Sequence, residues 1–128
     1  MKNNITNIQN NPVWRSLLYV PANNQRFIDK AHTRGADAII LDLEDSVPAA
    51  ERDRARAMLV DSAAAVGRSG ADVVVRINRP DAEAKSDLDA AVIAGVDALM
   101  LPKVDDAAHV LALAEAVEKL EGDRKSVV

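Results

Sequence analysis

The 128-residue sequence contains no cysteine, which excludes disulfide bonds and thiolate metal sites. No apolar run approaches the ~20 residues that a membrane-spanning helix needs, so no membrane association is expected. Lysine and arginine are spread along a chain of net charge −4, without the basic stripe that indicates a nucleic-acid partner. Residues 1–13 are polar and asparagine-rich, lack the apolar core of a signal peptide, and predict a disordered N-terminal arm of a cytoplasmic protein.

The chain does contain a repeated alternation of apolar strand signals and helical segments. The predicted strands are 15–21, 37–43, 72–78 and 98–102, and the predicted helices are 25–34, 49–66, 82–94 and 107–120. Such alternation predicts parallel strands joined by right-handed crossovers. An open doubly wound sheet would carry a glycine-rich phosphate turn after its first strand, but this chain has Pro21-Ala22-Asn23-Asn24 there and no G-x-G-x-x-G anywhere. The favoured fold is therefore α/β, with residues 14–122 forming four βα units, the N-terminal half of a (β/α)₈ TIM barrel.

Several local features follow from this assignment. Gly35 is expected to cap the first helix, and one face of the second helix, with Leu59 at its centre between Ala55 and Ala63, is expected to be buried. The side chains expected to face the barrel interior, and to lack partners in half a barrel, are Val20, Leu41, Val75 and Leu101. With open edges at the first and fourth strands, the isolated half is expected to be marginal, oligomeric or aggregation-prone.

The strand ends carry the charged residues. The apolar run 38–41 ends in three carboxylates within four positions, Asp42, Glu44 and Asp45. These are suited to hold Mg²⁺ directly or through water, or to pair with a cation. The alternative is that these carboxylates only end the strand and cap the next helix. Arg76 lies in an apolar strand and points opposite to its neighbours, and its guanidinium is costly to bury unless it meets an anion. An ion pair with Asp42 or Glu44 is the structural alternative to ligand binding.

The last six residues are distinct from the rest. Residues 123–128, DRKSVV, back-translate to GAT CGG AAG AGC GTC GTG, which a TAG stop would follow, and this string matches a widely used sequencing adapter. We expect the native sequence to end near Gly122, with residues 123–128 as an exposed extension past the fourth helix. The protein would then be the first part of a longer gene product.

Four segments at the strand ends carry a family resemblance. They are RSLLYVPANNQRFIDKA, ADAIILDLEDSVP with the following Arg56, VVVRIN and DALMLPKV. In this order they resemble the citrate lyase β-subunit-like group of the HpcH/HpaI aldolase/citrate lyase superfamily, which also includes malyl-CoA and citramalyl-CoA lyases, from about residue 14 to 117. The resemblance implies a Mg²⁺-dependent, homo-oligomeric (β/α)₈ enzyme. It would cleave or form a carbon–carbon bond of 3-hydroxyacyl thioesters by a retro-Claisen step, with the fragment itself inactive.

The resemblance also implies roles for residues. Arg76 would bind the free substrate carboxylate bidentately, with Tyr19 and Val20 in the same substrate site. Glu44 and Asp45 would act as catalytic groups that bind metal-bound water or orient Arg76. The direct Mg²⁺ ligands, a Glu and an Asp of the fifth and sixth strand regions, would lie beyond this chain.

Recognition of the acyl carrier is less defined. Lys30 matches a lysine that meets the carrier in CoA-using relatives, but the position of an accompanying arginine holds Asn24, with Arg26 two positions on. The carrier could therefore be CoA, the pantetheine arm of an acyl carrier protein, or neither, and Lys30 and Arg26 fit a solvated helix face equally well. Lys103 could lean over the site or lie on the surface, whereas His32 and His109 are expected to be ordinary helix residues. Two alternative functions stay open: a pyruvate-type class II aldolase of the same superfamily, and a non-catalytic half-barrel that serves as an assembly surface.

Overall fold

The computed structural model describes residues 12–126, so residues 1–11 of the predicted N-terminal arm and the last two residues lie outside the described part. Four strands alternate with four α-helices, as predicted. The elements are β1 (Leu17–Pro21), α1 (Gln25–Ala31), β2 (Ala38–Asp42), the short 3₁₀ helix η1 (Ala49–Glu51), α2 (Arg52–Val66), β3 (Asp72–Arg76), α3 (Asp81–Ala94), β4 (Ala98–Met100) and α4 (Ala107–Ser126). Each strand is shorter than predicted, because the residues beyond its ends turn into the connecting loops.

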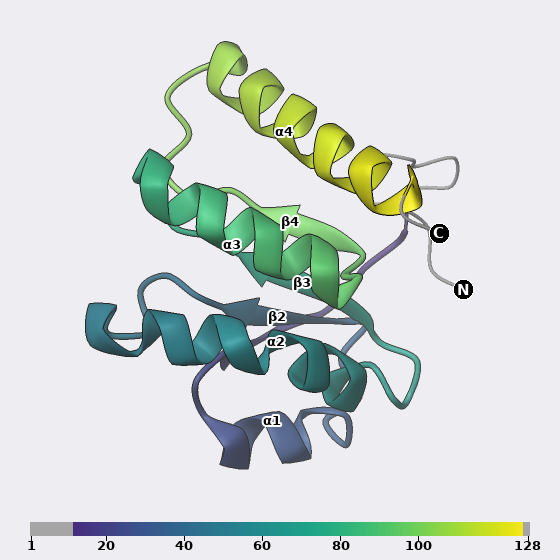
Figure 1. Cartoon of the computed structure of the whole chain (residues 1–128). Coiled ribbons are helices and arrows are strands. Elements are labelled where there is room, and N and C mark those ends of the chain that lie inside the picture. The colour runs from purple at the N-terminus through teal and green to yellow at the C-terminus, as the bar shows by residue number, and fades with distance from the viewer. Residues whose placement is uncertain (1–11, 127–128) are drawn as a thin grey trace.

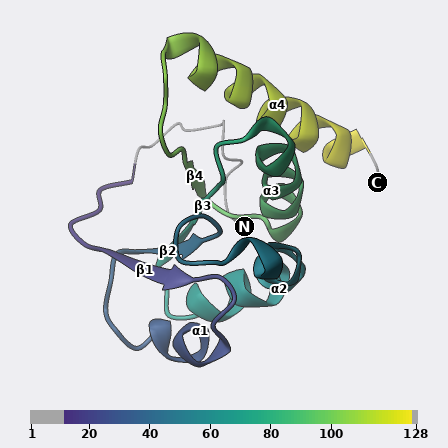
Figure 2. The same ribbon diagram turned by 90° about the vertical axis from the view of Figure 1, so that its left-hand side faces the viewer.

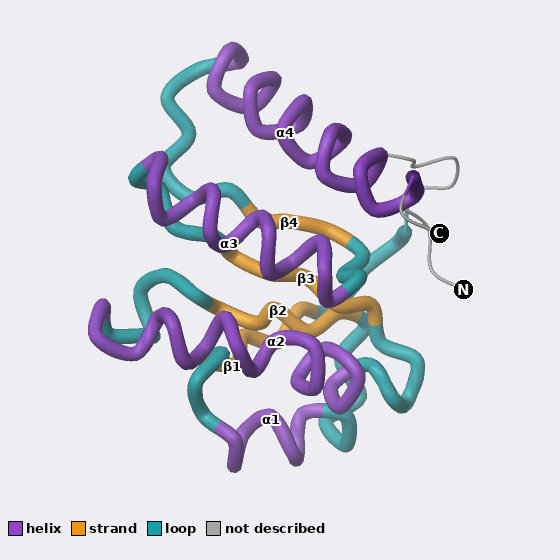
Figure 3. The backbone as a smooth tube through the Cα atoms, viewed as in Figure 1, coloured by secondary structure: helices purple, strands orange, loops and turns teal. Residues whose placement is uncertain are grey.

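The strands form one parallel sheet in the order β1-β2-β3-β4 (Figure 1). The helices lie on one side of this sheet in two perpendicular views (Figures 1 and 2), and the backbone tube shows the same layering (Figure 3). This arrangement confirms the prediction of adjacent parallel strands in sequence order. It differs from a doubly wound sheet, in which the strand order reverses and helices cover both faces.

The main core lies between the sheet and the helices. Leu41 and Val75 are fully buried there, and Val20 is 3% exposed, packed with the predicted apolar face of α2 that has Leu59 at its centre. The predicted inward orientation of Val20, Leu41, Val75 and Leu101 was therefore wrong. Because strand side chains alternate, the opposite face is formed by the other set, which includes Tyr19, Ile40, Val74 and Met100.

Two predicted helix ends were wrong. Helix α1 ends at Ala31 with His32 as its C-cap, so Gly35, at φ 76°, belongs to the loop before β2 and does not cap the helix. Helix α4 does not end near Leu120 but continues to Ser126, since Gly122 weakens a helix by only about 1 kcal/mol, so residues 123–126 are not an extension past this helix. No helix in the described part of the chain is both long and apolar enough to cross a membrane.

Candidate functional site

The sheet face turned away from the helices carries a charged cluster at the carboxyl ends of the strands. Asp42, the last residue of β2, is the register partner of Pro21 on β1 and of Arg76 on β3. Arg76 is in turn the partner of Met100, the last residue of β4. Parallel pairing thus brings the final residues of four strands to one edge, which is where α/β folds place their ligand sites.

Arg76 is held on two sides. Its Nε and Nη2 donate to Oδ1 and Oδ2 of Asp42, both at 2.8 Å, and its Cζ lies 4.9 Å from the centre of the Tyr19 ring. The Tyr19 hydroxyl lies 3.1 Å from Sδ of Met100, which fixes the far end of the ring. Within the described residues, Nη1 of Arg76 has no hydrogen-bond partner, so the second edge of the guanidinium, formed by Nη1 and Nη2, keeps unused N–H donors.

Asp42 is the anchor of this arrangement. Besides Arg76, its carboxylate accepts hydrogen bonds from the backbone N–H of Glu44 at 2.9 Å and from N and Oγ of Ser46 at 3.1 and 2.7 Å. Burial alone would raise the pKa of Asp42, but the bonds from Arg76 and then Ser46 outweigh it and lower that pKa from 3.8 to about 2. The same pairing raises the pKa of Arg76. Asp42 therefore stays ionised and holds a permanent cation beside it.

Glu44 lies between two cations. It is 5% exposed, with Oε1 3.5 Å from Nε of Arg76 and Oε2 2.5 Å from Nζ of Lys103. The Glu44 hydrogen bond raises the pKa of Lys103, and Asp45 stands 3.8 Å from the same ammonium group. Lys103 has a φ of 49°, a conformation that costs a non-glycine residue about 1 kcal/mol or more. The loop after β4 thus places Lys103 over the charged cluster.

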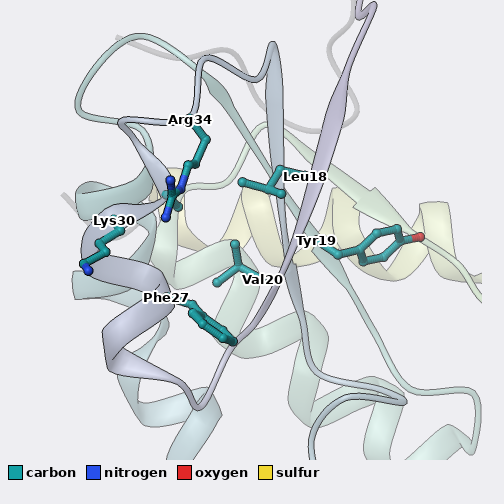
Figure 4. Close-up of a pocket in the computed structure, with 7 residues that line it drawn as sticks. Leu18, Tyr19, Val20, Phe27, Lys30 and Arg34 are labelled. Carbon is teal, nitrogen blue, oxygen red and sulfur yellow. The ribbon is translucent and has the colours of Figure 1, made fainter.

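The structure divides the predicted substrate residues between two places. Tyr19 lies beside Arg76, whereas Val20 is turned to the helix side of β1 and lines a different cavity of about 300 Å³ with Phe27 and Lys30. Figure 4 shows Tyr19 directed away from these residues, across the strand. Tyr19 also contributes to the lining of this cavity, as do Leu18, Ala31 and Arg34. The side chains of Val20 and Lys30 therefore do not join Arg76 in a single pocket.

Two other predicted binding residues have local positions. The side chain of Asn24 caps α1 by accepting a hydrogen bond from the backbone N–H of Phe27 at 3.1 Å, and Arg26 is exposed on the first turn of that helix. His32 contacts Ser69 Oγ at 3.1 Å, and the backbone of His109 is capped by Asp106, so both histidines lie outside the charged cluster.

Sequence reasoning missed Ser46 and Asn78. Ser46 lies four positions after Asp42, and an aspartate at a turn can accept hydrogen bonds from groups a few positions further on, which could have indicated their contact. Asn78 donates through Nδ2 to the carbonyl of Leu43 at 2.9 Å. Its place at the end of the RIN segment was visible, but its partner lies 35 residues away.

The described residues do not form a metal site by themselves. No three histidine, aspartate or glutamate side chains among them are gathered so that they could hold an ion. The oxygens of Asp42 and Glu44 already face Arg76 and Lys103. The carboxylates of this cluster are therefore suited to hold cationic side chains rather than to form a direct coordination shell.

The chain is an α/β protein with a parallel sheet and a preoriented arginine at the carboxyl edge, where folds of this class place their ligand sites. The family model described as HpcH/HpaI aldolase/citrate lyase matches residues 15–128, and the chain belongs to this family. The match confirms the resemblance drawn from the four strand-end segments.

Individual relatives agree with the family. Citrate lyase subunit beta of Leuconostoc mesenteroides subsp. cremoris is 40% identical over 102 residues, which are 79% of this chain and 34% of that protein. A (3S)-malyl-CoA thioesterase of Cereibacter sphaeroides is 41% identical over 108 residues, 84% of this chain and 38% of that protein. The chain thus spans little more than a third of the length of these curated relatives.

Solved structures show the same fold. Protein CitE of Mycobacterium tuberculosis, in complex with magnesium and acetate, is 37% identical with a TM-score of 0.63, over 77% of this chain and 40% of that chain. RipC of Yersinia pestis is 32% identical with a TM-score of 0.60, over 84% of this chain and 43% of that chain.

Proposed function

We propose that the intact protein is a carbon–carbon lyase that cleaves or forms a 3-hydroxyacyl thioester of citryl, malyl or citramalyl type. The proposal is supported by family membership and by relatives named citrate lyase subunit beta and (3S)-malyl-CoA thioesterase. The described residues would make up the first four βα units of a (β/α)₈ barrel. Their parallel order and the single helical layer support this architecture.

The observation that carries the proposal is the free edge of Arg76. Its Nε–Nη2 edge donates to Asp42, and the Nη1–Nη2 edge would donate two parallel hydrogen bonds to a carboxylate of the substrate. Because Asp42 and the Tyr19 ring fix the plane of the guanidinium, little side-chain entropy remains to be lost when a ligand binds. Arg76 would therefore hold the free carboxylate of the substrate, and it would fix the position of the bond that breaks.

The remaining groups would set the field around the reacting carbons. Glu44 and Lys103 form a neutral pair beside Arg76, and Lys103 is the more exposed of the two, with 64% of its side chain open to solvent. We assign Glu44 and Asp45 the role of orienting Arg76 and Lys103 and of accepting hydrogen bonds from bound water. Lys30 and Arg34, at the cavity between β1 and α1, would attract the phosphates of an acyl carrier.

Mg²⁺ dependence belongs to the same proposal. The CitE relative was solved with magnesium and with acetate, a small carboxylate, which supports a metal and a carboxylate site in the family. The direct ligands would come from strands that follow β4, since the described carboxylates are engaged with cations. When bound, the ion would stabilise negative charge that develops on the substrate oxygen. The intact protein would act as a homo-oligomer.

The test is thioester cleavage by the intact protein and its Arg76→Lys variant. A lysine keeps the charge but loses the planar pair of donors, so we expect kcat/KM to fall by about 100-fold or more. Arg68→Lys, an exposed position outside the site, is the matched control and should leave kcat/KM unchanged. Near-normal kcat/KM for Arg76→Lys would refute the carboxylate anchor. Cleavage of a free hydroxy-oxo acid but of no thioester would favour the class II aldolase instead.

A further inference from the structure

Behind the charged cluster, on the helix side of the sheet, lies a second set of buried polar residues that the proposed chemistry does not use. It consists of Asn78 in the loop after β3, Asp87 on α3 and Arg56 on α2. Asp87 is fully buried and Asn78 is 2% exposed. Burying an aspartate without compensation is costly, so such a group calls for an explanation.

Asn78 is one half of a clamp on Leu43. Leu43 donates its N–H to the carbonyl of Arg76 at 3.0 Å, and its own carbonyl accepts from Nδ2 of Asn78 at 2.9 Å. The N–H and the carbonyl of Leu43 are thus both held by the segment that contains Arg76 and Asn78. Since Leu43 stands between Asp42 and Glu44, this clamp sets where both carboxylates lie relative to Arg76.

Asp87 holds Asn78 in the required orientation. Its Oδ2 accepts from the backbone N of Asn78 at 2.7 Å and from Nδ2 of the same residue at 2.8 Å. Its Oδ1 accepts from Nη1 of Arg56 at 3.0 Å, and Arg56 is only 13% exposed. Every donor on the amide of Asn78 is therefore used, one on Asp87 and one on Leu43.

We propose that Asp87, supported by Arg56, is a positioning residue that fixes the site carboxylates through Asn78 and Leu43. The chain of contacts runs from α2 and α3 through the sheet edge to the Asp42–Arg76 pair. Burial raises the pKa of Asp87, and the bonds from Asn78 and the charge of Arg56 oppose this rise, so the carboxylate depends on its partners. The consequence for catalysis rests on the proposed function, whereas the positioning itself does not.

Asp87→Asn breaks the relay with an isosteric change. An amide presents one acceptor and one donor, so in either orientation it places an N–H group against the donors of Asn78 or of Arg56. The readout is the Nε–H resonance of Arg76 in the ¹⁵N-labelled intact protein, identified by its loss in Arg76→Lys. We expect its exchange with solvent to accelerate about tenfold or more, because the Asp42 partner is no longer held.

Two further variants make the test decisive. Asn78→Ala leaves the Arg56–Asp87 pair intact and opens only the clamp on Leu43, so it should accelerate the same exchange even if Asp87→Asn fails to fold. Glu83→Gln changes a partly exposed partner of Arg56, 3.0 Å away, and leaves Asp87 in place, so it should change the rate by less than about twofold.

An unchanged Arg76 resonance in folded Asp87→Asn or Asn78→Ala would overturn the inference, as would an equal acceleration in Glu83→Gln. In the intact protein, Asp87→Asn should lower kcat/KM by about tenfold or more, while Glu83→Gln should not lower it. If Arg76→Lys leaves the activity normal while the exchange result holds, the proposed function fails and the positioning role stands.

Discussion

Replacing Asp42 by asparagine removes the negative charge that Nε and Nη2 of Arg76 contact. In the native protein the pKa of Asp42 is about 2 instead of 3.8. This difference corresponds to about 2.5 kcal/mol of stability at neutral pH, because one pKa unit equals about 1.4 kcal/mol. The substitution also leaves a largely buried guanidinium without its anion, so we expect a loss of about 3 kcal/mol in the free energy of unfolding.

The stabilisation by Asp42 depends on pH. A carboxyl group with a lowered native pKa stabilises the fold above its unfolded pKa of 3.8, and this contribution is lost as the pH falls toward 2. The difference in the free energy of unfolding between the wild-type protein and Asp42→Asn should therefore reach its maximum by about pH 5. It should be about 1 kcal/mol smaller at about pH 3.

Urea unfolding followed by circular dichroism at these pH values measures the gap. Asp45→Asn is the matched control, because Asp45 is 71% exposed and lies 3.8 Å from Lys103, and it should cost less than about 0.5 kcal/mol. A gap that does not change between about pH 5 and pH 3, or an equal loss in the control, would refute the reasoning.

Two further predictions concern the framework. Gly95 ends α3 at φ 70°, a backbone conformation that alanine rarely adopts, so Gly95→Ala should destabilise the protein by about 1 kcal/mol even though the space around the residue is open. Gly122→Ala, inside α4, should instead stabilise the protein by up to about 1 kcal/mol. The melting temperatures of the two variants should therefore shift in opposite directions. Leu59→Ala, at a fully buried position, should cost about 2–5 kcal/mol in urea unfolding, and a loss below about 1 kcal/mol would contradict the assigned core.

The sequence by itself determined the order and type of the elements. Apolar runs such as 38–43 and 72–77, separated by helical segments, suffice for four parallel βα units, because strand and helix periodicities are local properties. The same runs indicated that Arg76 and the carboxylates of LDLED would meet, since the ends of adjacent parallel strands share one edge of the sheet.

The sequence did not determine which strand side chains face the helices and which face the opposite side of the sheet. Strands β2 and β3 are buried on both faces and have no polar alternation to mark an inner side, so Leu41 and Val75 could not be assigned to a face from their chemistry. Strand β1 is apolar on both faces although Leu17 and Tyr19 are exposed, so Val20 could not be assigned either. Helix ends were also poorly marked, because Gly35 and Gly122 resemble terminators in sequence while packing decides where a helix stops.

Only the tertiary structure decided the partners within the site. It placed both hydrogen bonds of Arg76 on Asp42, set Glu44 between Arg76 and Lys103, and directed the Tyr19 ring toward Arg76, away from the side chains of Val20 and Lys30. The contacts of Asn78 with Leu43 and Asp87 likewise join segments with no common sequence pattern. Such pairings depend on strand register and on the packing of α2 and α3, and these are fixed only when distant segments come together.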